Sequence, residues 1–531
     1  MAEQGHGGVA ISRSLKALGV ENLFALTGGH IFPILDGCHQ DDIRIVDTRH
    51  EQTAAFAAEG WARLTRSIGV VAVTAGPGVT NAISPLAQAR FNGAPVLMLA
   101  GRAPAFRWGK GSLQEIDHVP FVDPLAPAHT VFDTAAIPTE VIRAAAEAMT
   151  APRGPRFLDF PLDVLFNATD FEIPEVPGDN PVGPDDETVA SMAALVESSG
   201  RPIVIAGSNV WLDRAEDALL NLVETAGIPC FTNGQGRGCI PADHELAFAR
   251  SRSKAMREAD LVVVAGTPID FRLGFGENFA TDAKVVHVDH EVAEHLELAA
   301  SSSASIAATL EAMTDAISKT PETKEWVAAL RAAEDEKRES AQPELSSAQR
   351  PIHPMRVYGE LVPLLDRDAI VIGDGGDFVS YAGREIPSYT PGCWLDPGPY
   401  GCLGIGPGYA LAGRLAHPDR QVVVLFGDGA LGFSGMDLES FVRHDLPVTV
   451  VVGNNGIWGL EKHPMRGLYG YDVAAELQPE VSYDKAMEVF GGRGETVTDP
   501  EDLGAALRRA LDSGEPYLVN VLTDPEIAYP R

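Results

Sequence analysis

Two short apolar runs near the C-terminal end of the chain each stop at residues that carry oxygen ligands. The first run, Gln421–Phe426, is followed by Gly427-Asp428-Gly429, and the second, Pro447–Val452, is followed by Asn454-Asn455. Runs of this length and β-branched content are typical of strands buried on both faces of a parallel sheet. The separation of Asp428 from Asn455 fits one strand-helix-strand unit, so both side chains are predicted at one edge of such a sheet.

This pair of strand ends is suited to a divalent cation that holds a diphosphate. A lone carboxylate repels phosphate, but Mg²⁺ between them reverses the interaction. The predicted ligands are the Asp428 carboxylate, the Asn455 side-chain oxygen and the Ile457 carbonyl. The amides of Gly429 and Ala430 would lead into a helix expected over 436–443, where an anion is favoured. Either half alone would more often be a plain turn.

Taken together, the two strand ends resemble the signature of thiamine diphosphate enzymes. The resemblance implies a glutamate that contacts N1′ of the cofactor's pyrimidine ring and activates it. The segment Ile43–Gln52, followed by Thr53–Arg63, is similar to the family's pattern, with Glu51 as the match. The other interpretation of Glu51 is a solvated helix N-terminus. Glu59 is predicted to pair with Arg63, four positions on.

Other segments match further parts of the family's site. Strands that run into glycine turns are expected around Gly28-Gly29-His30 and Gly76–Asn81, and Leu403 matches the bulky residue that bends the cofactor. By resemblance, the catalytic residues are Glu51, Gln114, Gly29 and His30. By resemblance, the cofactor-binding residues are Glu51, Gly76, Asn81, Asp377, Phe378, Cys402, Leu403, Gly427, Asp428, Gly429, Ala430, Asn455 and Ile457.

The 531 residues are expected to form three doubly wound α/β domains with parallel sheets. These are a pyrimidine-binding domain over 1–175, a central nucleotide-binding-like domain over 187–335, and a diphosphate- and magnesium-binding domain over 352–531. The segments 170–186 and 334–351, rich in charged and small polar residues, are expected to connect them.

The formal net charge of −33 argues against nucleic acid or an anionic membrane as a partner. No apolar run approaches the roughly 20 residues of a membrane span. The five cysteines have no metal-type spacing, which favours a reducing cytoplasm. In the family that the chain resembles, Glu51 and Asp428 serve one cofactor from different subunits. That implies a homodimer at least, with a homotetramer expected.

The resemblance implies carbon-carbon lyase or ligase chemistry through an enamine (Breslow) intermediate, and it is closest to the branch that holds acetolactate synthase, oxalyl-CoA decarboxylase and 2-hydroxyacyl-CoA lyase. Gln114 fits the synthase loop, but Leu113 replaces its phenylalanine, and Trp458 stands too early to be the synthase's selecting tryptophan. These departures favour a 2-hydroxyacyl-CoA lyase that gives formyl-CoA and an aldehyde or ketone, with Glu476 or Glu480 helping to orient the substrate.

Two alternatives stay open. One is acetolactate synthase-like condensation, or decarboxylation, of 2-oxo acids such as pyruvate. The other is a binding or regulatory subunit without activity, against which the intact set of Glu51, Asp428 and Asn455 argues.

The central domain carries a weaker indication of a nucleotide. Thr267–Gly276 follows a buried apolar run, and Asp289 ends the next one, where an acidic residue can bind ribose hydroxyls. Arg272 and Asp289 are the candidates, for ADP or part of CoA rather than for FAD. A plain structural loop is the other interpretation. The short segment after the last expected strand, Tyr517–Leu522, leaves little length for a C-terminal lid.

Overall fold

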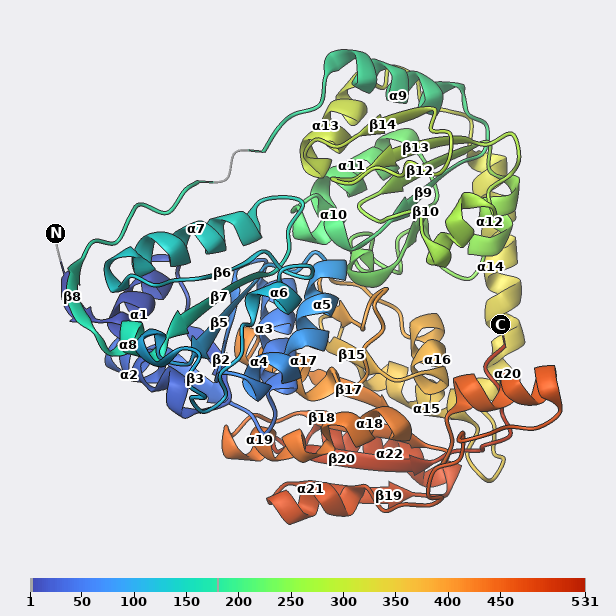
Figure 1. Cartoon of the computed structure of the whole chain (residues 1–531). Helices are drawn as coiled ribbons and strands as arrows, with labels where there is room; N and C mark the ends of the chain where they lie inside the picture. Colours follow the sequence, from blue (N-terminus) through green and yellow to red (C-terminus); the bar gives the residue numbers. More distant parts are fainter. Residues whose placement is uncertain (1–2, 179–180, 531) are drawn as a thin grey trace.

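The computed structural model describes residues 3–178 and 181–530, and it contains three parallel six-stranded sheets, each in its own α/β domain. Figure 1 shows the N-terminal domain in blue to cyan, the central domain in green and the C-terminal domain in orange to red. The expected class of three doubly wound α/β domains is confirmed.

The N-terminal sheet has the strand order β3-β2-β4-β5-β7-β6. Its strands are β2 (Asn22–Ala25), β3 (Arg44–Asp47), β4 (Gly69–Val73), β5 (Val96–Arg102), β6 (Ala128–Thr130) and β7 (Arg156–Pro161). The helices are α1 (Gly7–Ala17), α2 (Phe32–Gln40), α3 (Glu51–Thr65), α4 (Pro77–Asn81), α5 (Ile83–Phe91), α6 (Val119–Val122), α7 (Ile137–Met149) and α8 (Leu162–Phe166). A separate antiparallel pair, β1 (Glu3–His6) with β8 (Ala168–Phe171), ties the two ends of this domain together.

The C-terminal sheet repeats this topology, with the order β16-β15-β17-β18-β20-β19. Its strands are β15 (Ile370–Asp374), β16 (Trp394–Leu395), β17 (Val422–Gly427), β18 (Thr449–Asn454), β19 (Arg493–Val497) and β20 (Tyr517–Leu522). The helices are α15 (Pro354–Leu361), α16 (Asp377–Glu385), α17 (Gly406–Ala416), α18 (Asp428–Ser434), α19 (Leu438–Arg443), α20 (Gly459–Tyr469), α21 (Asp484–Phe490) and α22 (Pro500–Leu511). In doubly wound sheets ligands bind where the strand order reverses, which is between β2 and β4 and between β15 and β17.

The central sheet has a different order, β11-β10-β9-β12-β13-β14, which is that of dinucleotide-binding domains. Its strands are β9 (Pro202–Ala206), β10 (Cys230–Thr232), β11 (Ala247–Phe248), β12 (Leu261–Ala265), β13 (Lys284–Val288) and β14 (Ala300–Ser302). The helices are α9 (Asp186–Ser198), α10 (Ser208–Leu212), α11 (Glu216–Ala226), α12 (Arg252–Glu258), α13 (Ile306–Ala316) and α14 (Lys324–Leu345).

Two segments differ from expectation. The charged stretch expected as a connection from Glu334 is helical as far as Leu345, because it forms the solvated face of the long helix α14 while Glu334 itself is buried. The helix expected over 436–443 is present as α19, which begins at Leu438, and a further helix lies before it. Helix α18 starts at Asp428, directly after β17, and a short 3₁₀ turn, η7 (Gly435–Asp437), separates it from α19.

Helices α3 and α17 join the N-terminal and C-terminal domains, and residues of both domains share one hydrophobic core. Gly60 and Gly408 let the two helices approach closely, since a Cβ at Gly408 would lie 2.7 Å from Cβ of Phe56. Phe56 and Tyr409 meet edge to face at 6.3 Å between ring centroids. The two switch points are thereby joined through one shared core.

Among the helices in the described part of the chain, none has both the length and the apolar character that crossing a membrane requires.

Candidate active site

The ends of β17 and β18 lie side by side, as the sequence predicts. Gly427 is paired with Gly453 in register, so the residues that follow the two strands emerge at one edge of the sheet. The backbone N–H of Gly456 donates to Oδ2 of Asp428 at 2.8 Å. Asn455 donates through Nδ2 to Oδ2 of Asp377, at the start of α16, at 3.2 Å. Asp377, Asp428 and Asn455 therefore form one cluster.

This cluster is a buried acidic site. Asp428 is 3 % exposed, and burial raises its pKa to about 6, with the nearby charge of Asp377 adding to the effect. Burial also raises the pKa of Asp377. Two buried carboxyl groups favour a divalent cation, because the cation removes their mutual repulsion. The oxygen set of carboxylate, carboxamide and backbone carbonyl fits Mg²⁺.

The described residues contain no cluster of three or more His, Cys, Asp or Glu side chains arranged around a metal, so a cation here depends on amide and carbonyl oxygens as well.

Glycines at this edge allow close packing around the turns. A Cβ at Gly429 would lie 2.5 Å from the Trp458 ring, and a Cβ at Gly453 would lie 2.3 Å from the ring of Phe378. Gly375 has a φ of +144°, which L-residues rarely adopt. The turn before Asp377 is thus restricted to glycine at Gly375, and Gly429, directly after Asp428, has no room for a side chain.

The loop that carries Leu403 is fixed by two side chains that the sequence analysis did not single out. Asp374, the last residue of β15, accepts from the backbone N–H of Gly404 at 3.0 Å and of Gly406 at 2.7 Å. Gln88, from α5, accepts from the N–H of Cys402 at 3.1 Å. Asp374 ends the apolar run Ala369–Gly373, directly before the Gly375-Gly376-Asp377 turn, and this position was a usable signal. Gln88 gave none.

Glu51 is the first residue of α3 and is only 7 % exposed. Asn81 donates through Nδ2 to Oε2 of Glu51 at 3.0 Å. The interpretation of Glu51 as a solvated helix N-terminus does not fit this burial. Glu51 and Asn81, both predicted on the pyrimidine side, are brought into contact. Glu59, as expected, lies 3.9 Å from Arg63, and both side chains are buried.

His30, Gly76 and Gln114 gather at the same edge of the N-terminal sheet. Nδ1 of His30 lies 3.3 Å from the hydroxyl of Thr74, and burial lowers the pKa of His30, which favours a neutral ring. Gln114 has a φ of +57°, and its Cβ would be 3.0 Å from a Cβ at Gly76. Gly29 begins the 3₁₀ turn that carries His30. Leu113, expected beside the acyl group, is 77 % exposed.

A buried histidine supports this edge, and the sequence analysis missed it. Nε2 of His118 accepts from the N–H of Gly76 at 3.0 Å, and Nδ1 lies 2.8 Å from Oδ2 of Asp159. Arg102 binds the same carboxylate oxygen at 3.0 Å. Because Gly76 supplies an N–H, Nδ1 of His118 carries the ring proton toward Asp159. These partners are far apart in the sequence, so no local pattern indicated them.

The edges of the two domains meet within this chain. Gln52, next to Glu51, donates to the carbonyl of Leu403 at 3.3 Å. Asp437, which follows α18, accepts from the N–H of Arg49 and from the hydroxyl of Thr53, both at 2.7 Å. The family resemblance implied that different subunits supply these ends. Within one chain, these bonds join the loop and helix start around Glu51 to the segments that carry Leu403 and Asp437.

The remaining candidates have partners of their own. Arg272 forms an ion pair with Asp270 at 2.7 Å, and buried Asp289 accepts from Nδ2 of Asn209 at 2.8 Å. Burial raises the pKa of Asp289 to about 6. Glu476 is exposed and pairs with Lys462 at 2.5 Å, and its backbone pairs with that of Ile457 at the candidate metal edge. Glu480 is exposed as well.

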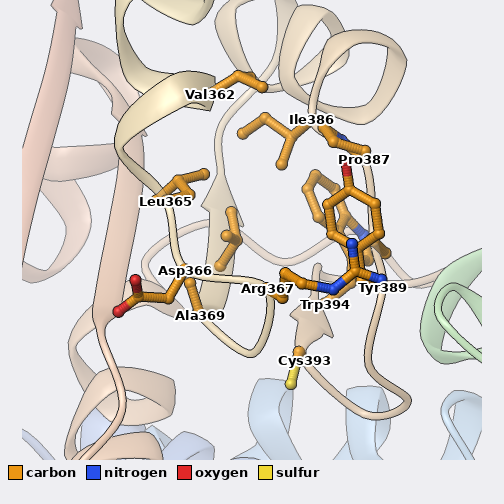
Figure 2. Close-up of a pocket in the computed structure, with 12 residues that line it drawn as sticks. Val362, Leu365, Asp366, Arg367, Ala369, Ile386, Pro387, Tyr389, Cys393 and Trp394 are labelled. Atoms are coloured by element: carbon orange, nitrogen blue, oxygen red, sulfur yellow. The ribbon is translucent and has the colours of Figure 1, made fainter. Parts of the chain in front are cut away.

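Two cavities lie in the C-terminal domain, and neither includes Asp428. Figure 2 shows the first, about 180 Å³, at the amino-terminal end of β15 beside Ala369, which is the end opposite Asp374. The second, about 270 Å³, is lined by Gly459, Leu460, His463, Pro464, Ala528 and Tyr529. It lies near the cluster, since a Cβ at Gly459 would be 2.1 Å from Oδ2 of Asp377.

Comparisons with known proteins agree with this geometry. Residues 5–121 match the N-terminal TPP binding domain of thiamine pyrophosphate enzymes, residues 189–316 match their central domain, and residues 374–521 match their C-terminal TPP binding domain. The acetolactate synthase large subunit IlvG of Mycobacterium tuberculosis is 52% identical over 537 residues, which covers 100% of this chain and 98% of that protein. The 2-hydroxyacyl-CoA lyase 2 of Caenorhabditis elegans is 35% identical, covering 97% and 89%. The human protein of that name is 33% identical, covering 97% and 90%.

Proposed function

Because this chain belongs to the thiamine pyrophosphate enzymes, we propose that it is a magnesium-dependent acetolactate synthase-like enzyme that acts on 2-oxo acids such as pyruvate. The observation that carries the proposal is the 52% identity to an acetolactate synthase large subunit along the whole of both chains. The sequence analysis favoured a 2-hydroxyacyl-CoA lyase because of Leu113 and Trp458. The lyase relatives are more distant, at 30–35% identity, so the preference is reversed.

The residues at the two edges have distinct roles in the proposed enzyme. Asp428, Asn455 and the Ile457 carbonyl would hold Mg²⁺ against the diphosphate, with the turns at Gly375-Gly376 and Gly427 close to the phosphates. Leu403 would press against the cofactor between its rings. When bound, thiamine diphosphate supplies a carbon nucleophile for the 2-oxo group and takes up the electrons that loss of CO₂ releases.

Proton handling falls to the N-terminal edge. Glu51 would hold a proton at the pyrimidine N1′, while Asn81 keeps its Oε2 in place. His30, neutral because of its burial, and Gln114 can donate hydrogen bonds to substrate oxygens. In the overall reaction one pyruvate loses its carboxylate as CO₂, a bond forms to the keto carbon of a second pyruvate, and that oxygen gains a proton.

A 2-hydroxyacyl-CoA lyase remains the second candidate, and one structural observation favours it. Leu113 is 77 % exposed, and Phe106 and Ile116 in the same loop are exposed as well, which offers an apolar surface for an acyl chain beside His30. The same edge would then orient a 2-hydroxyl group, and the products would be formyl-CoA and an aldehyde or ketone.

Product analysis decides between the two candidates. Purified protein with thiamine diphosphate and Mg²⁺ is incubated with pyruvate or with a 2-hydroxyacyl-CoA, and acetolactate, CO₂ and formyl-CoA are measured. The proposal expects acetolactate and CO₂ in a 1:1 ratio from pyruvate. Formyl-CoA from the thioester, with no acetolactate from pyruvate, would replace the synthase by the lyase.

A further inference from the structure

The crevice where a dinucleotide would bind the central sheet is closed by its own loops. It lies beyond the carboxyl ends of β9 and β12. The N–H of Gly207 donates to the carbonyl of Ala265, and the N–H of Asn209 donates to the carbonyl of Gly266, both at 2.9 Å. A Cβ at Gly207 would lie 2.3 Å from the Cβ of Thr267. The two loops that would embrace a pyrophosphate are therefore bonded to each other.

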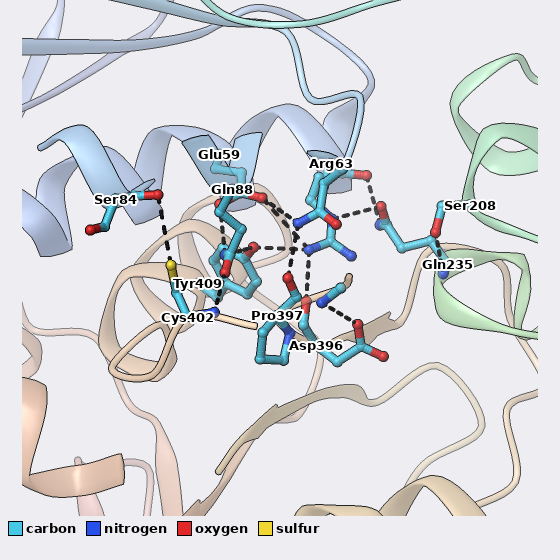
Figure 3. Close-up of polar contacts among 12 residues, drawn as sticks. Glu59, Arg63, Ser84, Gln88, Ser208, Gln235, Asp396, Pro397, Cys402 and Tyr409 are labelled. Atoms are coloured by element: carbon cyan, nitrogen blue, oxygen red, sulfur yellow. Dashed lines mark hydrogen bonds and ion pairs between the residues drawn. The ribbon is translucent and has the colours of Figure 1, made fainter. Parts of the chain in front are cut away.

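The C-terminal end of α3 lies against this edge instead. The carbonyl of Arg63 accepts from Nε1 of Trp211 at 2.7 Å and from Nε2 of Gln235 at 3.0 Å. In return, Nε of Arg63 donates to Oε1 of Gln235 at 2.9 Å, and Figure 3 shows this reciprocal pair. Both side chains are buried. The N–H of Gln235 donates to the hydroxyl of Ser208, the first residue after the β9 turn.

A second contact between α3 and the central domain lies one helical turn later. Arg66, the left-handed C-cap of α3, places its guanidinium 3.8 Å from the Trp211 ring centroid and pairs with Glu216 at 2.7 Å. The last carbonyls of a helix lack hydrogen-bond donors within the helix, and here the central domain supplies the donors. Stacking and ion pairing add to those hydrogen bonds.

We propose that the dinucleotide-type edge of the central domain serves as a clamp for α3 and so fixes Glu51 at the other end of this helix. A 15-residue helix is a rod about 22 Å long, and displacing one end displaces the other. Trp211 and Gln235 are positioning residues that act through Glu51. The inference rests on the proposed function only in that Glu51 contacts the cofactor. The bonds between the loops after β9 and β12 separately imply that FAD, ADP and CoA do not bind this crevice.

The test uses two matched tryptophans of the central domain. Trp211→Phe removes the donor to the Arg63 carbonyl, whereas Trp326→Phe removes a donor to the carbonyl of Pro202, inside the central domain. Gln235→Glu, which keeps the acceptor for Arg63 and loses the donor, is a second variant. Each is made with Glu51 and with Glu51→Gln in the full-length chain. Thiamine diphosphate affinity with Mg²⁺ is measured by calorimetry, and the melting temperature is recorded.

We expect Trp211→Phe and Gln235→Glu to weaken cofactor binding by about fivefold, the factor for a hydrogen bond of about 1 kcal/mol. Trp326→Phe should lower the melting temperature without this loss, and with Glu51→Gln the losses should vanish, because the effect passes through Glu51. Equal affinities of the Trp211 and Trp326 variants, or a loss that persists with Glu51→Gln, would overturn the proposal.

The second part of the test measures whether nucleotides bind the central domain. The purified protein should be colourless, and FAD, ADP and CoA should leave its melting temperature unchanged. Saturable binding of FAD or ADP would overturn the closure of the crevice by the loops after β9 and β12. None of these affinity and melting-temperature measurements requires the protein to turn over pyruvate. A protein that makes no acetolactate but shows the Glu51-dependent pattern would therefore refute the proposed reaction and keep the clamp.

Discussion

Asp374 is a buried acid that fixes the loop carrying Leu403 through hydrogen bonds. Its carboxylate receives the N–H groups of Gly404 and Gly406, and so it holds the turn that carries Leu403. Burial nevertheless dominates and raises the pKa of Asp374 to about 7. The hydrogen bonds favour the charged carboxylate, and burial favours the neutral acid. With a pKa of about 7, Asp374 is partly protonated at neutral pH.

This raised pKa predicts a pH dependence of stability. An unfolded aspartate has a pKa of about 3.9, so between pH 4 and pH 7 the folded chain binds more protons at Asp374 than the unfolded chain. The contribution is full below pH 4 and is lost as the pH rises through 7. Relative to Asp374→Asn, the wild-type protein should lose up to about 1.4 kcal/mol per pH unit between pH 5 and 7. Urea unfolding at both pH values measures this, and parallel curves for the two proteins would contradict it.

Glu51→Gln separates cofactor binding from proton transfer. Glutamine keeps the size of the side chain and an oxygen for Asn81, so the cofactor should still bind, but it cannot hold the proton at N1′. We expect kcat to fall by about 10² to 10⁴, the range of general acid-base catalysis. Steady-state kinetics with pyruvate and cofactor titration measure both quantities. An unchanged kcat would remove Glu51 from the role of activating residue.

At the scale of elements, the crossing of α3 and α17 depends on glycine. A Cβ at Gly408 would lie 2.7 Å from the carbonyl oxygen of Thr53, whereas a Cβ at Gly413 in the same helix would meet only ordinary contacts at 3.5 Å. We expect Gly408→Ala to destabilise the protein by about 1–3 kcal/mol through overpacking. Gly413→Ala, the control, should be neutral or stabilise by up to about 1 kcal/mol, since alanine is the better helix former. Thermal unfolding of both variants checks the sign of each change.

Local patterns in the sequence predicted the elements that carry the ligands. The buried runs before Asp428 and Asn455, and the helix that begins at Glu51, are set by apolar content and glycine turns within a few residues. The hydrogen bonds that fix the loops of the site could not be predicted from the sequence. His118 with Gly76 and Gln88 with Cys402 join segments that are 42 and 314 residues apart. Helix α14 was missed because its charged, serine-containing face is also typical of a linker.

At the scale of the whole molecule, the proposed homodimer places Glu51 of one copy and Asp428 of the other at each cofactor site. Within each chain, Gln52 contacts the carbonyl of Leu403 and so joins the N-terminal and C-terminal domains. Phe433 and Met436, beside this junction, are exposed in the single chain, and a second copy would cover them.

Mixing two inactive variants tests the assembly. If the site lies between subunits, a mixed dimer of Glu51→Gln and Asp428→Asn chains contains one intact site. Up to about a quarter of wild-type activity should then return after joint refolding, since half of the dimers are mixed and each has one of two sites. Refolding each variant alone is the control. No recovery in the mixture would contradict the shared site and show that each chain builds its own.

The most direct measurement is calorimetric titration of thiamine diphosphate into the full-length protein at saturating Mg²⁺. We predict one cofactor per chain at neutral pH, weaker binding below pH 6, where Asp428 is protonated and cannot bind the cation, and severe loss in Asp428→Asn. Absence of any binding at saturating Mg²⁺, or binding that is the same in Asp428→Asn and in the absence of Mg²⁺, would contradict the assignment of this edge as the diphosphate and magnesium site.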